Sequence, residues 1–258
     1  MTDPVVVTGS GDVVGPMPGR FEGSPGTMQG GYLAGVATTG YSVPARVQLR
    51  KPIIPGDTLM RSVDGDDTLW HRNDTLVMKV FASEVLAEPA ARVTQSDVDD
   101  VMSRPRPFAK PYPTCAGCGD RTDGLGVDLR PLAKRVIGTW TPTEAIDGAV
   151  PREHTWTVLD CLTSWAVFAD PPADASGSFV TGNIAAQFVR PVLPGVTYRM
   201  QSWRIRDLEP DVFKLGSVLV AGTIEDDDGP VVRCDQEMVR TLDQGMPLRN
   251  VLDQISGS

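Results

Sequence analysis

The sequence predicts an α+β fold in which two buried helices are each wrapped by a long antiparallel β-sheet. Two observations predict it. A short motif occurs twice along the 258 residues, and an apolar segment of helical length precedes each copy. Strand-like stretches follow each copy. One buried helix and then a run of strands, found twice in the same order, is typical of α+β architecture.

The repeated motif occupies residues 47–59 and 186–198. Each copy reads as a strand, a basic residue with proline, two apolar residues, Pro-Gly and the start of another strand. Proline cannot continue a paired strand, and Pro-Gly favours a tight turn from which the next strand begins at once. The two copies therefore predict the same connection between two strands.

The helices are expected at Gly30–Gly40 and Thr157–Phe168. Neither segment has a clear polar stripe, and a helix that is apolar all round is buried. Small residues in the first helix allow a sheet to wrap closely around it. A turn is expected at residues 226–230. Strands are expected at residues 58–63 and 75–86 in the first half, and at residues 197–206, 212–224 and 231–242 in the second.

These elements divide the chain into four parts. The first unit covers residues 1–100, and the second covers residues 125–245. Between them, residues 101–124 form a linker that is dense in proline and holds two cysteines. Residues 246–258 form a tail, expected to be a short, loosely held helix or disordered.

The composition limits the partners. The net charge of −9 argues against nucleic acid and anionic membranes as partners, because binding to either needs clustered Lys and Arg. No stretch reaches the roughly 18 consecutive apolar residues of a membrane span. The first residues lack the basic and apolar regions of a secretory signal. Four cysteines in a chain of this length do not indicate a disulfide scaffold, so we expect a reduced, cytoplasmic protein.

A glycine-led buried helix with an antiparallel sheet, found twice, resembles the double hot-dog type of acyl-CoA thioesterase II. The resemblance covers most of residues 20–242. Gly30-Gly31 resembles the Gly-Gly helix start of that family. Residues 113–119 have no counterpart there and resemble a linker of uncharacterised, actinobacterial-type thioesterase-like proteins.

Three residues of the second half match the site of that family. Asp160 lies near the start of the apolar helix, Thr181 precedes the strand-ending proline by ten residues, and Gln236 lies in the last strand. In the family, an Asp, a Thr and a Gln at these places hold the attacking water.

The resemblance implies hydrolysis of an acyl-CoA, with coenzyme A as part of the substrate and no separate cofactor. Asp160 would be the general base, and Thr181 and Gln236 would orient the water. The backbone N–H groups of Gly30 and Gly31 would stabilise the oxyanion. Asn183 is assigned to substrate binding together with the two glycines.

Each of these residues also has a structural interpretation. Thr157-x-x-Asp160 fits a capping box, so Asp160 would only cap its helix. By strand alternation Gln236 shares a face with apolar neighbours and would be a satisfied core glutamine. The same alternation places Thr181 on the face of Asn183, opposite Ile184, where it would face solvent.

Cys115-x-x-Cys118 has the spacing of a zinc or redox motif. Zinc needs about four ligands, and the sequence has no second close pair. A redox motif belongs at a strand-to-helix junction that is not found here. We therefore predict a compact turn without a metal.

His154, just before the second predicted helix, is expected either in a pocket or at the surface. The remaining Cys and His residues are scattered along the chain: His71, Cys161 and Cys234.

Two other functions stay open on the sequence. One is a binding module that holds an acyl group or coenzyme A without turnover. The other is an enoyl-CoA hydratase-like enzyme, whose relatives carry an Asp and a His five residues apart. Asp160 is followed at that distance by Trp165, which disfavours hydratase chemistry. The acyl chain length and assembly into a homo-oligomer also stay open.

Overall fold

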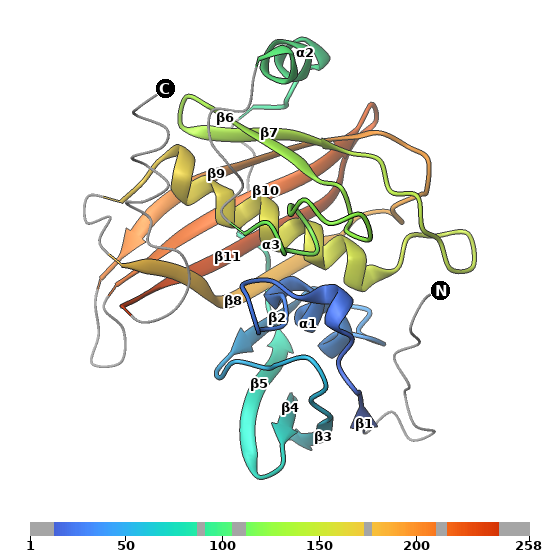
Figure 1. Cartoon of the computed structure of the whole chain (residues 1–258), viewed down its shortest axis with the longest axis vertical. Coiled ribbons are helices and arrows are strands. Elements are labelled where there is room, and N and C mark those ends of the chain that lie inside the picture. The colour runs from blue at the N-terminus through green and yellow to red at the C-terminus, as the bar shows by residue number, and fades with distance from the viewer. Residues whose placement is uncertain (1–12, 87–90, 105–111, 173–176, 210–215, 243–258) are drawn as a thin grey trace.

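A computed structural model describes residues 13–86, 91–104, 112–172, 177–209 and 216–242. In these residues eleven strands form one antiparallel sheet, with helices on one face and at one end (Figure 1). The helices are η1 (Gly19–Phe21), α1 (Gly30–Ala37), α2 (Gln95–Ser103) and α3 (Arg152–Ala169). The strands are β1 (Val13–Val14), β2 (Ala45–Leu49), β3 (Leu59–Asp64), β4 (Asp67–Arg72), β5 (Thr75–Ala82), β6 (Asp128–Leu132), β7 (Arg135–Trp140), β8 (Ser178–Phe188), β9 (Tyr198–Leu208), β10 (Ser217–Asp226) and β11 (Gly229–Thr241).

The strand order is nearly the same when it is counted outward from the centre of the sheet in either direction. The first half runs β2-β5-β4-β3-β1, and the second half runs β8-β11-β10-β9-β7-β6. The halves meet where β2 pairs with β8, with Val47 opposite Ile184. The sheet is therefore continuous through both halves of the chain.

The repeated motif forms the same connection in each half, from β2 to β3 and from β8 to β9. Of its two apolar residues, the first is buried in both copies, at 1% exposure for Ile53 and 3% for Val192. The glycines of the two Pro-Gly turns have φ values of +89° at Gly56 and +77° at Gly195. Such positive φ values favour glycine, as the third position of a type II turn requires.

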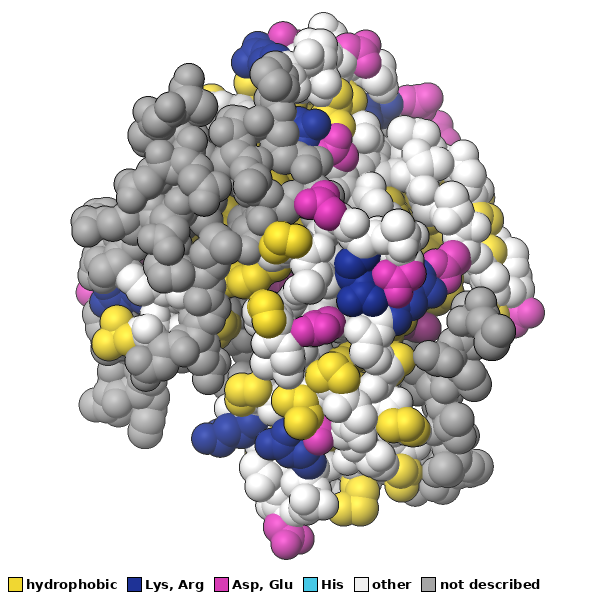
Figure 2. All heavy atoms as spheres, in the orientation of Figure 1, with side chains coloured by type: hydrophobic (Ala, Val, Ile, Leu, Met, Phe, Trp, Pro, Cys, Tyr) yellow, Lys and Arg dark blue, Asp and Glu magenta, His cyan; other side chains and the backbone are white. Residues whose placement is uncertain are grey.

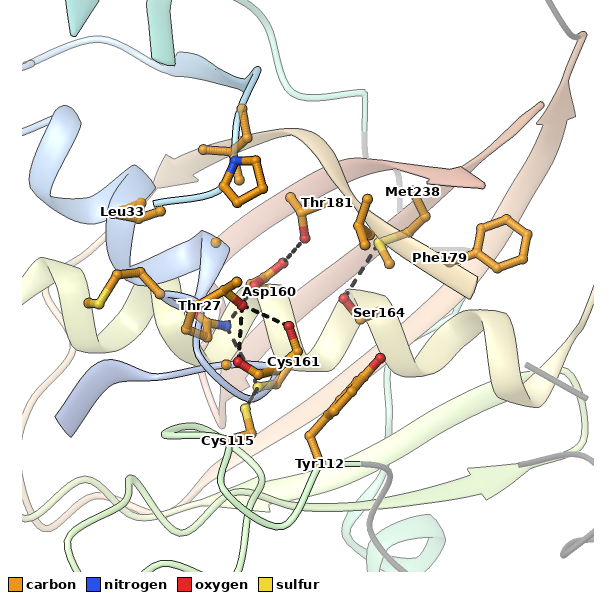
Figure 3. A pocket seen from close by; sticks show the side chains of 18 of the residues that line it. Thr27, Leu33, Tyr112, Cys115, Asp160, Cys161, Ser164, Phe179, Thr181 and Met238 are labelled. Carbon is orange, nitrogen blue, oxygen red and sulfur yellow. Dashed lines mark hydrogen bonds between the residues drawn. The ribbon is translucent and has the colours of Figure 1, made fainter. Parts of the chain in front are cut away.

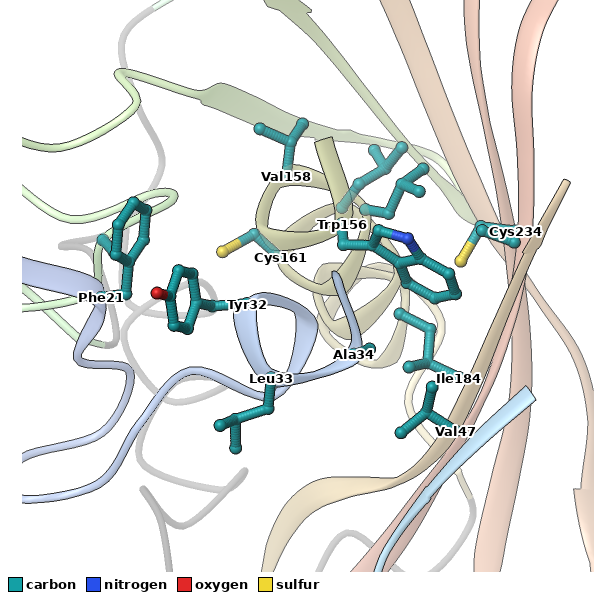
Figure 4. Packing of buried hydrophobic residues seen from close by; sticks show 14 of the residues in the cluster. Phe21, Tyr32, Leu33, Ala34, Val47, Trp156, Val158, Cys161, Ile184 and Cys234 are labelled. Carbon is teal, nitrogen blue, oxygen red and sulfur yellow. The ribbon is translucent and has the colours of Figure 1, made fainter. Parts of the chain in front are cut away.

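Helices α1 and α3 pack against each other on one face of the sheet (Figures 1 and 4). Trp156 of α3 is fully buried between the helix and the strands, toward Ile184 of β8 and Cys234 of β11. On the other side, the ring of Tyr32 in α1 stacks on Phe21 with centroids 4.1 Å apart. The core is therefore shared between the two halves.

Two glycines four residues apart set how closely the helices approach. A Cβ atom at Gly31 would lie 2.1 Å from the carbonyl oxygen of Trp156. One at Gly35 would lie 2.3 Å from the Cα of Glu153. Both residues face α3 because positions i and i+4 share one side of a helix. The absence of a side chain at these two positions lets the backbones of α1 and α3 touch.

Most predicted elements are present, with one shift that matters. Helix α1 begins at Gly30 as predicted, and the predicted turn at residues 226–230 joins β10 to β11. Helix α3 begins at Arg152, five residues before the predicted start, because its first turn is polar and does not continue the apolar pattern. The sequence did not predict η1, α2, β1, β4, β6 or β7. Residues 105–111 of the predicted linker and the whole predicted tail lie outside the described residues.

No helix among the described residues is both long and apolar enough to cross a membrane. On the face shown in Figure 2, basic side chains lie among acidic ones and do not form a continuous basic stripe.

The helix contact makes a first prediction. Replacing Gly35 by Ala forces a methyl group into the backbone of α3, and we expect a loss of about 1–3 kcal/mol in the free energy of unfolding. The thermal midpoint should fall by several degrees. Gly19→Ala is the matched control, because a Cβ there would lie 3.9 Å from the Cβ of Pro55, an ordinary van der Waals contact. Equal stability of the two variants would contradict the close helix contact.

Candidate active site

A cavity of about 920 Å³ lies between the start of α1, the middle of α3, the first residues of β8 and the loop that contains Cys115 (Figure 3). Asp160 and Thr181 both line it. Much of the remaining lining is apolar, and includes Leu33, Leu49, Ile53, Trp165, Phe179 and Met238. The cavity is therefore largely apolar, with the carboxylate of Asp160 in its wall.

The Asp160 carboxylate accepts four hydrogen bonds from three other elements. Its Oδ1 accepts from the Thr181 hydroxyl at 2.6 Å and from the Gln236 amide at 2.5 Å. Its Oδ2 accepts from the backbone N–H of Gly31 at 3.0 Å and from the Gln29 amide at 2.6 Å. All four partners donate, which suits an ionised carboxylate.

The orientation of the Gln29 amide is fixed by its other contacts. Its Oε1 accepts from the backbone N–H of Tyr32 at 2.7 Å, which caps α1. Its Nε2 donates to the carbonyl of Thr157 at 3.1 Å. A flipped amide would place an oxygen against that carbonyl and a second donor against the N–H of Tyr32. The Nε2 group must therefore face Asp160.

Burial is the main influence on the acidity of Asp160. The side chain lies in the core, and desolvation raises its pKa to about 6. The hydrogen bonds from Thr181, Gly31 and Gln236 lower the pKa, while the nearby Cys115 thiol raises it. The carboxylate is therefore mostly ionised at neutral pH but accepts a proton more readily than an exposed aspartate.

Thr181 points toward Asp160 because β8 is irregular at Gly182. Asn183 pairs with Glu237, and Thr181 pairs with the next residue, Met238, so that Gly182 has no partner of its own. An unpaired residue of this kind reverses the alternation of side chains. Thr181 thus lies on the helix-facing side, and its predicted place on the face of Asn183 is wrong.

Gln236 lies on the apolar face of β11, as the alternation predicts, and is fully buried. Its Nε2 donates to Asp160 and, at 2.7 Å, to the Thr181 hydroxyl. Its Oε1 is hydrogen-bonded to the hydroxyl of Thr163. Gln236 does not line the cavity and so lies behind the other two residues.

The capping interpretation of Asp160 is wrong. Thr157 lies inside α3, where its hydroxyl donates to the carbonyl of Glu153 at 2.7 Å. Asp160 is in the third turn of the helix, away from its N-terminus. The N-terminus that does contact the carboxylate is that of α1, through Gly31.

The predicted substrate-binding residues have different surroundings. Gly30 lines the cavity, whereas the N–H of Gly31 is used by Asp160. Asn183 lies away from the cavity. Its amide donates to Glu237 at 2.5 Å and accepts from Arg46 at 2.7 Å on the opposite face of the sheet. The structure therefore brings Asp160, Thr181 and Gln236 together but does not bring Asn183 to them.

The sequence did not predict a role for Gln29, whose amide hydrogen-bonds to Asp160, to the carbonyl of Thr157 and to the N–H of Tyr32. The available signal was its position, since a polar residue directly before an apolar helix is a candidate cap.

His154 is buried beside the ring of Phe21 and does not line the cavity. Burial lowers its pKa to about 4.

Comparisons with solved structures identify the fold. A candidate thioesterase from Novosphingobium aromaticivorans aligns with a TM-score of 0.57 and 14% identity, over 93% of this chain and 100% of that one. A hot-dog protein of unknown function from Alicyclobacillus acidocaldarius aligns with a TM-score of 0.56 and 12% identity, over 92% and 96%. The protein has a hot-dog fold.

A third solved structure, a candidate thioesterase II from Thermobifida fusca, aligns with this hot-dog chain with a TM-score of 0.54 and 16% identity, over 89% and 91%. No protein-family model matches the sequence, and no curated protein matches it. At these sequence identities the alignments identify the fold only. The chemistry has to be argued from the residues of the site.

The contacts of Gln29 make a second prediction. In Gln29→Glu, an oxygen replaces the group that donates to Asp160, so two carboxylates face each other in the core. At pH 8 we expect the free energy of unfolding to fall by about 3 kcal/mol or more. Gln29→Leu removes the same hydrogen bonds without adding a charge and should cost less, about 1–3 kcal/mol. Denaturant unfolding measures both, and a Glu variant as stable as the Leu variant would argue against the contact.

Proposed function

We propose that this protein is a thioester hydrolase that acts on acyl-CoA, and that its two halves are two hot-dog units in one chain. The observation that carries the proposal is the carboxylate of Asp160, held by Thr181 and Gln236 at the wall of an apolar cavity. The fold supports it, because solved structures that align over most of their length include candidate thioesterases.

The cavity suits a substrate with an apolar acyl part. Its volume of about 920 Å³ lies in the range of ligand pockets, roughly 300–1,000 Å³. The acyl group would lie among the apolar side chains, and the thioester carbonyl would lie near Asp160. Arg50 and Lys51 also line the cavity and offer positive charge to an anionic substrate such as coenzyme A.

In the proposed reaction, water approaches Asp160 from the cavity side, next to Thr181. Asp160 takes a proton from the water as the oxygen attacks the thioester carbonyl carbon. The resulting oxyanion lies near the first turn of α1, where the N–H of Gly30 is the proposed donor. The carbon–sulfur bond then breaks, and the thiolate takes the proton from Asp160. The products are a carboxylic acid and free coenzyme A.

Thr181 and Gln236 have different parts in this proposal. Thr181 lines the cavity and can contact the water directly. Gln236 is a positioning residue, because it acts through its bonds to Asp160 and Thr181. Gln29 and Gly31 hold the other oxygen of the carboxylate, so that Asp160 cannot rotate away.

One observation favours a second candidate, an acyl or coenzyme A binding module without turnover. The four donors around Asp160 fill roughly all the acceptor positions of a carboxylate, which is also how a structural carboxylate is held. In the enzyme, one donor on the cavity side must yield to water. In the binding module, all four stay in place.

The proposal predicts the kinetics of two variants. With a panel of short, medium, long and aromatic acyl-CoA substrates, Asp160→Asn should lower kcat/KM by about 10²–10⁴-fold, because the general base is lost. Thr181→Val keeps the shape of the side chain and removes the hydroxyl, so we expect a loss of about 10–100-fold. Release of free thiol measures the reaction.

Thr155→Val is the matched control for these variants. It makes the same replacement on α3, at a buried hydroxyl for which the described residues provide no hydrogen-bond partner. It should retain the wild-type rate. Binding of these substrates without thiol release would favour the binding module. Thiol release that persists in Asp160→Asn would overturn the assignment of the base.

A further inference from the structure

A cluster of three buried thiols lies beside the carboxylate and has no part in the proposed hydrolysis. Cys115 and Cys118 come from the loop before β6, and Cys161 comes from α3. Their sulfur atoms all lie within 4.8 Å of one another, and those of Cys115 and Cys161 are 3.5 Å apart (Figure 3). All three residues are 5% exposed and line the cavity.

We propose that Cys115, Cys118 and Cys161 bind one zinc ion, with the fourth coordination position facing the cavity. Thiolates are soft ligands that zinc prefers. With a Zn–S bond of about 2.3 Å, the sulfurs of a tetrahedral site lie about 3.8 Å apart. The Cys115–Cys161 sulfur separation of 3.5 Å is close to this value, and all three sulfurs lie within 4.8 Å of one another, so the cluster can close around one ion with small side-chain shifts.

The loop of residues 113–120 folds so that the sulfurs of Cys115 and Cys118 face α3. It is closed by backbone hydrogen bonds from Gly119 to Cys115 at 2.9 Å and from Asp120 to Pro113 at 2.8 Å. A Cβ at Gly119 would lie 2.3 Å from the carbonyl oxygen of Cys115. One at Gly117 would lie 2.4 Å from the sulfur of Cys161. Glycine at both positions permits the tight turn and the approach to the helix.

Each sulfur also accepts hydrogen bonds from N–H groups. Cys118 accepts from the indole of Trp165 at 3.4 Å, and Cys161 accepts from the Gln29 amide at 3.8 Å. Cys115 accepts from the backbone N–H groups of Cys118 and Gly117. Donors of this kind stabilise negative sulfur and orient metal ligands. Thiols that only fill an apolar core would not need them.

Two other interpretations account for less of this arrangement. A disulfide would join two of the sulfurs and leave the third without a function, together with its donor. Simple core packing explains burial but not three sulfurs at ligand spacing. With three protein ligands, a zinc site keeps one position for water or for a thiol that enters the cavity.

Cobalt(II) titration of the whole chain tests the proposal. The protein is reduced, stripped of metal with a chelator and titrated with Co²⁺ without oxygen. We expect one Co²⁺ per chain, with sulfur-to-cobalt charge transfer and the visible bands of a tetrahedral site, and displacement by Zn²⁺. Cys161→Ser should weaken binding more than about 100-fold, because it removes a ligand rather than a supporting residue.

Cys234→Ser is the matched control, since Cys234 is a buried free cysteine on β11 outside the cluster. It should bind Co²⁺ as the wild type does. The thermal midpoints of the metal-free proteins check folding, and Cys115→Ser and Cys118→Ser repeat the test from the loop.

The absence of saturable Co²⁺ binding, or equal affinity in Cys161→Ser and wild type, would overturn the zinc site. So would a Cys115–Cys161 disulfide in protein that binds no metal once reduced. The readout is metal binding, so the result does not depend on whether the chain hydrolyses thioesters.

Discussion

The buried carboxylate of Asp160 connects the two halves of the molecule. Its Oδ2 is held by Gln29 and Gly31 from the first half, and its Oδ1 is held by Thr181 and Gln236 from the second. A charge in a core is stable only when donors replace the water it has lost. The donors from Gln29 and Gly31 are present because α1 packs directly on α3, so half of the hydrogen bonds to the carboxylate depend on the joining of the halves.

Two features of the backbone make this arrangement possible. Gly31 and Gly35 let the helices touch, which places the N–H of Gly31 within reach of the carboxylate. Gly182 interrupts the pairing of β8 and turns Thr181 toward α3. These glycines therefore help to position the hydrogen-bond donors of Asp160. A side chain at any of them would shift the backbone and move a donor away from the carboxylate.

The cavity beside Asp160 brings two kinds of chemistry together. One side has a carboxylate whose pKa burial raises to about 6, and the other has three thiols at metal-ligand spacing. Gln29 contacts both, because its Nε2 lies near Asp160 and near the sulfur of Cys161. A metal at the thiols and a base at Asp160 would therefore share one supporting side chain.

The sequence by itself determined the periodic features of this protein. Apolar segments without a polar stripe predict α1 and most of α3, and the repeated Pro-Gly motif predicts the matching connections in the two halves. Alternation along β11 places Gln236 inward. These predictions succeed because they depend on neighbours in the chain, whose spacing sets which side a residue faces.

Only the tertiary structure decided which distant residues meet. Thr181 faces inward because one unpaired residue reverses the alternation, which a regular pattern cannot reveal. Gln29 reaches Asp160, and Cys161 reaches Cys115, across 131 and 46 residues of sequence. Such contacts depend on how closely α1 and the cysteine loop pack on α3, and no local preference of the chain specifies that distance.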